Sequence, residues 1–518
     1  MKNNDVIKNI LASILQQIVT IICGFIAPRL IISTYGSNVN GMITSITQFL
    51  GYITLLEAGI APVVKAALYK KIVNCDKESI EKILKATEHF FRIIAIIFIV
   101  YLLILCIIFP NIYSSEYSFG YTISLVLIIA ISTLFEYFFG MTYNIYLQAE
   151  QKNYVVSIVK VVLKILNTVA IIILTLNDYS IQVVKLVSSI IFVMSPLILN
   201  LYVKRKFNIN LKNVKYKDAK YALENKWAGF SQHIAAIIHN SVDVAILTFF
   251  SNPMEISVYS VYMLVINSIK DLAISLSGGI DAWFGNLLAK GDNKKLNENL
   301  KLYEFFYFSI VTFLFACTMA LEIPFVKVYT NGITDVNYIR PTFAYIMILA
   351  ELIMAIRVPY NNIALSAGHF KQTQNGAWIE AILNIVISCI LVKKLGIVGV
   401  AIGTLIAMIF RTVEFVIYSS KNILNRSSIE VVKKISLMLL EIFLIFLLSR
   451  VLPFEYESTY LSFVKNGVFI SIIAIIVISC GNIFIYRSEI KQIKTLLKRK
   501  SNKNGKWCLY KKHYRFIQ

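Results

Sequence analysis

The segment Phe90–Phe109 reads FFRIIAIIFIVYLLILCIIF, and Arg92 is its only charged residue. A run of about 20 mostly apolar residues can cross the hydrocarbon layer of a bilayer, about 30 Å thick, as a helix. A helix is required because it satisfies its backbone polar groups within one segment, which lipid cannot do. Similar runs recur along most of the chain, for example at Leu11–Ile32. The sequence therefore predicts an all-α polytopic membrane protein.

The composition also favours lipid as the solvent of this chain. Of its 518 residues, 57% are hydrophobic and 15% are charged, whereas soluble domains average about 25% charged residues. The first apolar run is too long for a signal peptide, so we expect it to be the first span. The seven cysteines show no paired spacing, which favours small apolar fillers over disulfides or metal ligands. We predict no metal and no cofactor.

The apolar runs predict about 14 membrane-spanning helices. Their approximate limits are 9–34, 41–68, 89–110, 119–148, 153–175, 181–203, 227–250, 256–289, 303–327, 338–366, 373–392, 396–418, 432–452 and 461–486.

Lys and Arg residues alternate between the loops that join these spans. The turns near Gly36, Tyr113, Asp178 and Asn252 contain neither residue, whereas the loop at 204–220 holds a cluster of them. The positive-inside rule places the cation-rich loops in the cytoplasm, and an even number of spans places both termini there. The net charge of +22 therefore follows from topology, and we do not expect nucleic acid as a partner.

An internal repeat relates the two halves of the chain. A shift of 214 residues places Arg29 on Asp243 and Glu57 on Asp271, and the offset then drifts to 217 or 218. Parallel repeats of this kind predict a central site between the halves and alternating access by rocking one half against the other. The predicted parts are an N-terminal six-helix lobe (1–204), a cytoplasmic linker (205–226), a C-terminal six-helix lobe (227–420), two appended helices (421–486) and a basic cytoplasmic tail (487–518).

Charged residues lie deep within several predicted spans. Such a residue costs about 2.5–3.5 kcal/mol on insertion unless it faces a cavity or a partner. Arg binds phosphate oxygens with two parallel hydrogen bonds, and Lys acts as a point charge. The candidates for binding a phosphate-bearing substrate are Arg29, Lys160, Lys164, Lys270 and Arg357. The candidates for ion coupling or gating are Glu57, Asp243 and Asp271.

Some of these charges have alternative interpretations. Lys164 lies too deep in its span to reach the membrane surface easily, which favours a cavity position. Lys160 and Arg357 lie nearer the cytoplasmic ends of their spans, so snorkelling to the surface is the alternative for them. Arg411 and Glu414 are three residues apart, so they share one helix face and are expected to neutralise each other.

The acids of the repeat also allow two interpretations each. Arg29 and Asp243 occupy equivalent places with opposite charge, so we expect them to pair across the cavity when it is closed on the outer side; pairing within each half is the alternative. Glu57 and Asp271 are matched acids near the middle of the membrane. They either bind a proton or a sodium ion, or act as counter-ions to Arg29 and Lys270.

Two segments carry a resemblance to a known family. Residues Arg29–Gly41 read RLIISTYGSNVNG, and Leu55–Pro62 read LLEAGIAP; Asn240–Asp243, Val258–Tyr262 and Gly396–Thr404 fit the same pattern. Together they resemble the polysaccharide exporter family, with its Wzx-type oligosaccharide flippases, of the multidrug/oligosaccharidyl-lipid/polysaccharide exporter superfamily. The resemblance implies two six-helix lobes around a central cavity plus two appended helices. It carries functional roles onto Arg29, Glu57 and Asp243.

The resemblance also implies a function. We expect a flippase that moves an undecaprenyl-diphosphate-linked oligosaccharide to the outer leaflet of a bacterial cytoplasmic membrane, for cell-surface polysaccharide biosynthesis and without catalysis. Its expected partners are the lipid-linked oligosaccharide, membrane lipids, and glycan polymerases and glycosyltransferases. Alternatives with the same fold are a drug/cation antiporter and a peptidoglycan-precursor flippase. A membrane glycan polymerase or glycosyltransferase is an alternative of another class, but the sequence lacks a large outer loop and a catalytic motif.

Overall fold

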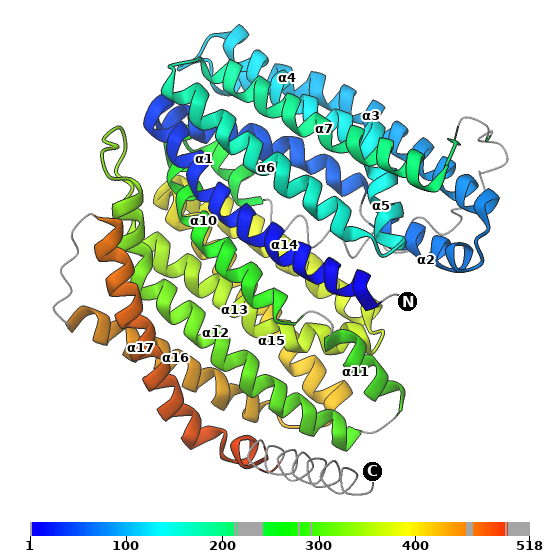
Figure 1. The fold of residues 1–518 in the computed structure, drawn as a ribbon. Helices are drawn as coiled ribbons and strands as arrows, with labels where there is room; N and C mark the ends of the chain where they lie inside the picture. Colours follow the sequence, from blue (N-terminus) through cyan, green and yellow to red (C-terminus); the bar gives the residue numbers. More distant parts are fainter. Residues whose placement is uncertain are drawn as a thin grey trace, which may run out of the picture. The chain divides into compact units, whose positions relative to one another are not determined.

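The computed structural model shows a chain built from helices (Figure 1). The residues that the structure describes are 3–57, 59–211, 214, 242–277, 280–290, 293–451, 459–492 and 495. Within these ranges the regular elements are all helical. The predicted span at 227–250 lies outside the described residues except for 242–250, which are helical. Most of the predicted linker and tail also lie outside them.

The first half of the chain contains nine helical elements in the described ranges. They are α1 (Asn3–Gly51), η1 (Tyr52–Glu57), α2 (Ile60–Val73), α3 (Lys77–Ile112), α4 (Phe119–Phe135), η2 (Glu136–Gly140), α5 (Met141–Ala149), α6 (Asn153–Leu176) and α7 (Ile181–Phe207).

The second half continues the series among its described residues. Its elements are α10 (Pro253–Ser275), α11 (Ile280–Ala289), α12 (Asn293–Tyr329), α13 (Pro341–Ser366), α14 (Phe370–Leu395), α15 (Ile397–Ser419), η5 (Ser420–Leu424), α16 (Ile429–Val451) and α17 (Tyr460–Ile485).

Ten helical segments of the described chain are long and apolar enough to cross a membrane. The first two predicted spans form one segment, Ile7–Glu57, because α1 continues past a break at Gly36 (φ 86°, ψ 166°). The predicted span at 227–250 is largely outside the described residues, and α10 and α16 are less apolar or more highly charged than the ten. These points account for the difference from the roughly 14 spans expected from apolar runs.

Local signals in the sequence set the helix ends near the predicted cytoplasmic side. The Asp76 carboxylate accepts a hydrogen bond from the backbone N–H of Ser79 at 3.1 Å and caps α3. It also pairs with Lys71 at 3.1 Å. The hydrogen bond from Ser79, together with Lys71, lowers the pKa of Asp76 to about 2. The cap is therefore charged at neutral pH, as the start of a helix favours.

The repeat of the two halves is visible in the backbone. Left-handed residues are rare outside glycine, yet they end corresponding helices in both halves, at offsets of 217 or 218 residues. The pairs are Gln151 (φ 58°) with Gly368 (φ 76°), Asp178 (φ 55°) with Gly396 (φ 56°), and Asn208 (φ 51°) with Asn425 (φ 49°). The offsets equal those predicted from the sequence, so the structure confirms two repeat halves.

The chain forms two compact units. The first unit comprises Met1–Leu264, Tyr329–Tyr338 and Ala377–Thr404; the second comprises the remaining residues. The first unit therefore combines the N-terminal half with segments of the C-terminal half. The predicted six-helix lobes were defined by the sequence repeat and not by contacts, so their boundaries remain a prediction.

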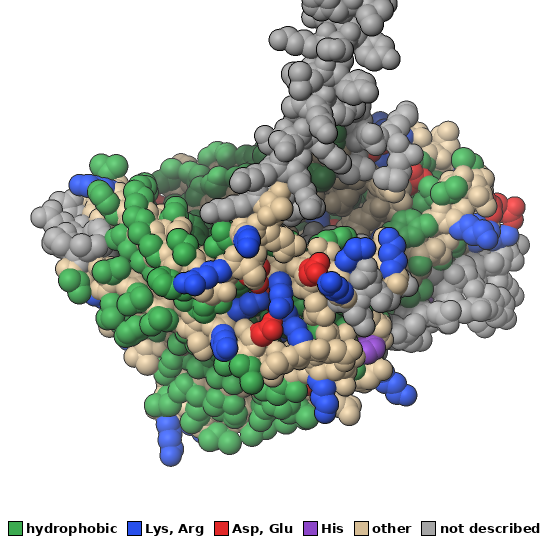
Figure 2. Space-filling model, turned by 90° about the horizontal axis from the view of Figure 1, so that it is seen from below, with side chains coloured by type: hydrophobic (Ala, Val, Ile, Leu, Met, Phe, Trp, Pro, Cys, Tyr) green, Lys and Arg blue, Asp and Glu red, His purple; other side chains and the backbone are tan. Residues whose placement is uncertain are grey.

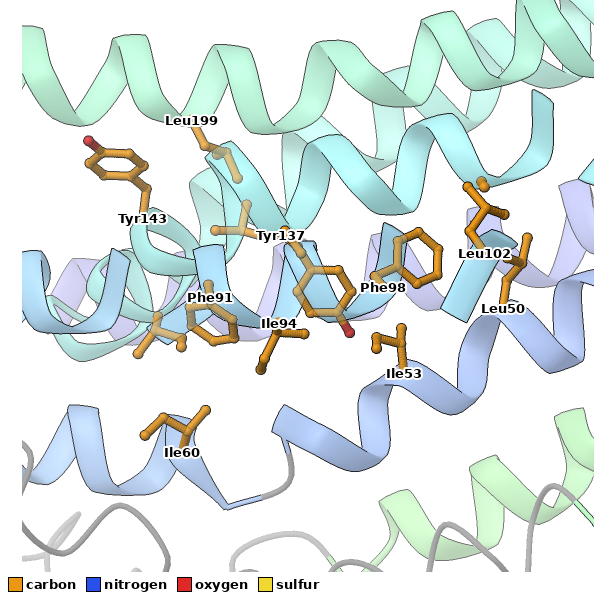
Figure 3. Close-up of a cluster of buried hydrophobic side chains, with 14 of the residues drawn as sticks. Leu50, Ile53, Ile60, Phe91, Ile94, Phe98, Leu102, Tyr137, Tyr143 and Leu199 are labelled. Carbon is orange, nitrogen blue, oxygen red and sulfur yellow. The ribbon is translucent and has the colours of Figure 1, made fainter. Parts of the chain in front are cut away.

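The core of the first unit forms between α3, η2 and α7. Phe91, Phe98 and Tyr137 are buried there, with Leu199 of α7 against them (Figure 3). The opposite face of α3 is equally apolar but exposed: Leu103 is 60% accessible and its neighbours are similar. A helix that is apolar on both its packed and its exposed face requires lipid around it. Figure 2 shows broad hydrophobic areas on the surface, and a group of Lys and Arg side chains mixed with acids near the middle of this face.

We predict that Gly41→Ala destabilises the first unit. A Cβ at Gly41 would overlap the backbone carbonyl of Pro253, which cannot move without shifting the start of α10. Overpacking of this kind costs about 1–3 kcal/mol. The control is Gly24→Ala in the same helix, where a Cβ meets nothing within 4 Å. Thermal unfolding in detergent should show a lower midpoint for Gly41→Ala alone, and equal midpoints would contradict the close packing against Pro253.

Candidate functional site

A cavity of about 460 Å³ lies within the first unit, between α1, η1, η2, α6 and α7. Its wall contains two acids, Glu57 and Glu136, and two cations, Lys160 and Lys164. Hydroxyl groups from α1, α4 and α7 complete the lining. Three of the residues predicted from the sequence, Glu57, Lys160 and Lys164, are therefore brought together in one site.

Breaks in regular helix position the two acids. Glu57 ends the 3₁₀ turn η1, and Gly59 follows with a left-handed backbone (φ 86°). Glu136 begins the π-helical turn η2, and π-turns inside helices often occur at functional sites. Gly140 leaves room for the Glu136 carboxyl, because a Cβ there would contact it at 2.9 Å.

The carboxyl groups of the cavity are only partly neutralised. Glu57 interacts with the Tyr137 hydroxyl, while its Oε2 is buried without a hydrogen-bond partner in the described part of the chain. Lys160 is the cation that acts on Glu136. A buried carboxyl oxygen without a partner is unfavourable, so this atom is a place where a proton or a cation would bind.

The two cations lie four residues apart on α6 and differ in exposure. Lys160 is exposed and Lys164 is half-buried. Lys185 of α7 lies close enough to Lys164 to act on it electrostatically. Lys185 was not among the residues predicted from the sequence. Its position inside a predicted span could have identified it as a candidate. The cavity wall therefore presents a positive side along α6.

A second polar cluster surrounds Asp243 in the same unit. The Asp243 carboxylate accepts hydrogen bonds from Tyr259 at 3.1 Å and from Thr404 at 3.1 Å. The Asn384 Oδ1 atom accepts from Ser388 at 3.0 Å and from Thr404 at 3.4 Å. All five side chains are buried. They come from helix 242–250, α10, α14 and α15.

The atoms that take part in these hydrogen bonds are all oxygen atoms. The Val400 carbonyl extends the set, since it accepts from Ser388 at 3.3 Å and from Thr404 at 3.2 Å. Carboxylate, amide, hydroxyl and carbonyl oxygens are the ligands of hard cations. Asp243 was predicted from the sequence but Asn384 and Thr404 were not, because neutral polar residues in a span give no charge signal.

The predicted ion pair between Arg29 and Asp243 is not formed in this structure. Arg29 Nη2 instead donates to the backbone carbonyl of Asn331 at 2.5 Å. Its Nη1 is buried without a partner among the described residues. Asp243 has the hydroxyl partners given above. In this structure Arg29 therefore has a backbone partner in the 329–338 loop in place of Asp243.

The predicted site residues of the second unit, Lys270, Asp271 and Arg357, do not line the cavity of the first unit. Lys270 lies 3.4 Å from Glu351, and both side chains are buried. Asp271 is exposed and Arg357 is half-buried. Glu351 is an acid in the middle of a predicted span, so the depth argument that selected Lys270 applies to it as well. Glu351 therefore joins Asp271, the predicted counter-ion, as an acid beside Lys270.

Two further ion clusters stabilise the second unit. Arg411 and Glu414 pair at 2.5 Å, which confirms the prediction from their spacing. The second cluster centres on Glu304 of α12, which is fully buried and pairs with both Arg426 and Lys434 (2.6 Å). It ties the start of α16 to α12. Spacing along the chain could not predict it, because Glu304 is more than a hundred residues from either cation.

We predict that Glu304→Gln strongly destabilises the second unit. The change leaves two buried cations without a counter-charge, and breaking a buried pair in this way costs about 3–5 kcal/mol. The matched control is Glu430→Gln, which removes a half-exposed pair with Lys301 (3.1 Å) and should cost at most about 1 kcal/mol. Urea or thermal unfolding in detergent measures both. Equal losses would show that the Glu304 cluster is not a structural tie.

The arrangement of helices places the chain in a fold class that solved transporter structures share. A structure titled "Lipid II flippase MurJ, inward closed conformation" matches with a TM-score of 0.70 at 16% identity, covering 93% of this chain and 100% of the other. An inward-facing multidrug resistance MATE family transporter of the MOP superfamily matches with a TM-score of 0.60 at 15% identity, over 78% of this chain and 94% of the other.

A third structure, of the MATE multidrug transporter DinF-BH, matches with a TM-score of 0.55 at 15% identity, over 82% of this chain and 96% of the other. No protein-family model and no curated protein sequence matches the chain. At these identities the likeness establishes the fold. The chain is thus a multi-pass helical membrane protein with two repeat halves, in agreement with the fold predicted from its sequence.

Proposed function

We propose that this protein is a flippase that carries an undecaprenyl-diphosphate-linked oligosaccharide across a bacterial cytoplasmic membrane by alternating access, for cell-surface polysaccharide synthesis. The observation that carries the proposal is the cavity of the first unit, where Lys160 and Lys164 lie beside hydroxyl groups and two acids. The shared fold with a structure titled as a lipid II flippase supports it. Lipid II is the cargo of that protein, and a lipid-linked glycan is the corresponding cargo here.

The cavity chemistry matches a diphosphate linked to a sugar. The ammonium groups of Lys160 and Lys164 attract the diphosphate oxygens as point charges. Hydroxyls of the wall, such as Thr20, Ser132 and Ser195, would hydrogen-bond sugar hydroxyls. Glu57 and Glu136 balance the lysines while the cavity is empty, so that binding of the head group exchanges one anionic partner for another. The lipid tail remains in the bilayer.

The cluster around Asp243 supports ion coupling as part of the same proposal. It brings a carboxylate, an amide oxygen, two hydroxyls and a carbonyl within hydrogen-bond distance of one another in a buried position. A sodium ion or a proton bound there would change the charge of a core that joins α10, α14 and α15. The gradient of that ion would then bias the conformational cycle.

The charge of the cavity is our reason for preferring a flippase over a drug/cation antiporter. A drug/cation antiporter needs an acid-dominated cavity, and the MATE structures make that the second candidate. Here Glu57 and Glu136 are matched by Lys160 and Lys164, and Lys185 adds a further positive charge nearby. A peptidoglycan-precursor flippase would use the same diphosphate chemistry, and it differs from our proposal only in the glycan.

The setting in the cell is part of the proposal. We infer that the cation-rich loops and both termini face the cytoplasm, where the cargo is made. Glycosyltransferases that build the oligosaccharide and a polymerase that consumes it are the expected partners, and the basic tail would contact anionic membrane lipids.

We predict that Lys164→Ala lowers flipping of a lipid-diphosphate-linked oligosaccharide in proteoliposomes by roughly tenfold, the factor that corresponds to about 1.4 kcal/mol. The cause is the loss of a half-buried cation that holds the diphosphate. The control is Lys204→Ala, which removes an exposed cation at the end of α7 and should flip normally. Normal flipping by Lys164→Ala, with both variants expressed equally, would remove the cavity from the transport path.

We predict that sodium stabilises the protein through Asp243. A ligand at 100 times its dissociation constant raises stability by about 2.7 kcal/mol, so sodium should raise the unfolding midpoint relative to choline. Asp243→Asn should abolish this shift, while the control Asp178→Asn, at an exposed outer turn, should keep it. If sodium has no effect but acidic pH stabilises the wild type and not Asp243→Asn, the coupling ion is a proton. An identical response of wild type and Asp243→Asn to both ions would exclude the cluster as a coupling site.

A further inference from the structure

The loop between α12 and α13 closes over the break in α1. The carboxylate of Asp335 accepts a hydrogen bond from the backbone N–H of Ser37 at 2.6 Å and another from the Ser37 hydroxyl at 2.7 Å. Gly36 makes the break in α1 possible, because its φ of 86° suits glycine. Both oxygens of Asp335 thus bind the residue directly after the break.

A chain of buried hydroxyls continues from this contact. The Tyr338 hydroxyl lies 2.6 Å from the Ser37 hydroxyl and 2.9 Å from that of Ser257 in α10. The Tyr262 hydroxyl donates to the Tyr338 carbonyl at 2.8 Å. Ser37, Ser257 and Tyr262 are fully buried. The loop is therefore tied to α1 and to α10 at once.

Other bonds join the same three segments. Asn40 donates to the hydroxyls of Ser257 (2.9 Å) and Ser260 (3.2 Å). Arg29 donates to the Asn331 carbonyl, and the Tyr329 hydroxyl donates to the carbonyl of Phe25 at 2.7 Å. All these residues belong to the first compact unit, although the loop and α10 come from the second repeat and α1 from the first.

We propose that residues 329–338 form an outer latch, in which Asp335 and Tyr338 hold the two repeats together at the predicted outer side. Their hydrogen bonds to Ser37 and Ser257 must break before cargo can leave. The proposal rests on the alternating-access function proposed above. The kink at Gly36 and the loop both lie at turns that the charge pattern places outside the cytoplasm.

The chemistry of the latch suits repeated opening. Asp335 is exposed, so water can replace its hydrogen bonds as they break. The inner contacts are between neutral hydroxyl groups, which exchange with water at little net change in free energy. Opening therefore separates no buried charge, in contrast to the Glu304 cluster. Asp335 and Tyr338 are gating residues that were not predicted from the sequence.

Accessibility of a buried cysteine tests the latch without any cargo. Ser45→Cys, in a background with the native cysteines replaced, puts the reporter on α1, eight residues after Ser37; Ser45 is fully buried and its hydroxyl lies 2.8 Å from that of Thr248. A membrane-impermeant maleimide is added from outside. Asp335→Ala should speed labelling at least tenfold, the factor for about 1.4 kcal/mol, because it removes two hydrogen bonds to a charged group.

Two further variants make the result specific. Glu116→Ala removes an exposed acid from another outer loop and should label at the parent rate. Asp335→Asn keeps one acceptor oxygen for the Ser37 N–H and should label at an intermediate rate. This variant tests the latch even if Asp335→Ala folds poorly. Equal rates for the parent, Asp335→Asn and Asp335→Ala would overturn the latch.

Flipping measured on the same samples separates the two proposals. Faster labelling of the Asp335 variants in a protein that flips no lipid-linked oligosaccharide supports the latch and removes the proposed cargo. Active flipping with unchanged labelling removes the latch and leaves the flippase.

Discussion

A charge buried among membrane helices must face an oppositely charged partner or a cavity, because lipid does not solvate it. This constraint organises the described part of the chain. Lys270 with Glu351, and Glu304 with Arg426 and Lys434, are neutralised by protein. Those charges stabilise the fold. Half-buried Lys164 of α6 has a cavity beside it instead, which is why we propose the site there.

The sequence predicted the fold well, because the constraint acts on composition and periodicity. Span length follows from bilayer thickness. The repeat offset of 217 or 218 residues also separates matched left-handed residues in the structure, such as Asp178 and Gly396. The Arg411–Glu414 pair was predictable because three residues along a helix is a fixed distance. The kink at Gly36 was expected as a turn, and the structure keeps the helix running through it.

The partners of the site residues were less predictable. Depth in a span identifies a costly charge but not what faces it, since that depends on packing between helices far apart in sequence. Lys270 and Glu351 are 81 residues apart, and Ser37 and Asp335 are 298 apart. Arg29 was therefore assigned to Asp243 by repeat symmetry, whereas it donates to Asn331. Neutral partners such as Thr404 cannot be identified by depth in a span, because that argument applies only to charged residues.

The choice of polar group separates permanent contacts from reversible ones. Breaking the Glu304 cluster would leave two buried cations unpaired, so that contact persists through any cycle. The contacts of the 329–338 loop consist of hydroxyls and one exposed carboxylate, and water can substitute for each. The alternating access that we propose needs both kinds of contact. The contacts of the 329–338 loop lie within the first compact unit and the Glu304 cluster within the second, as expected if the proposed latch moves and the ion cluster does not.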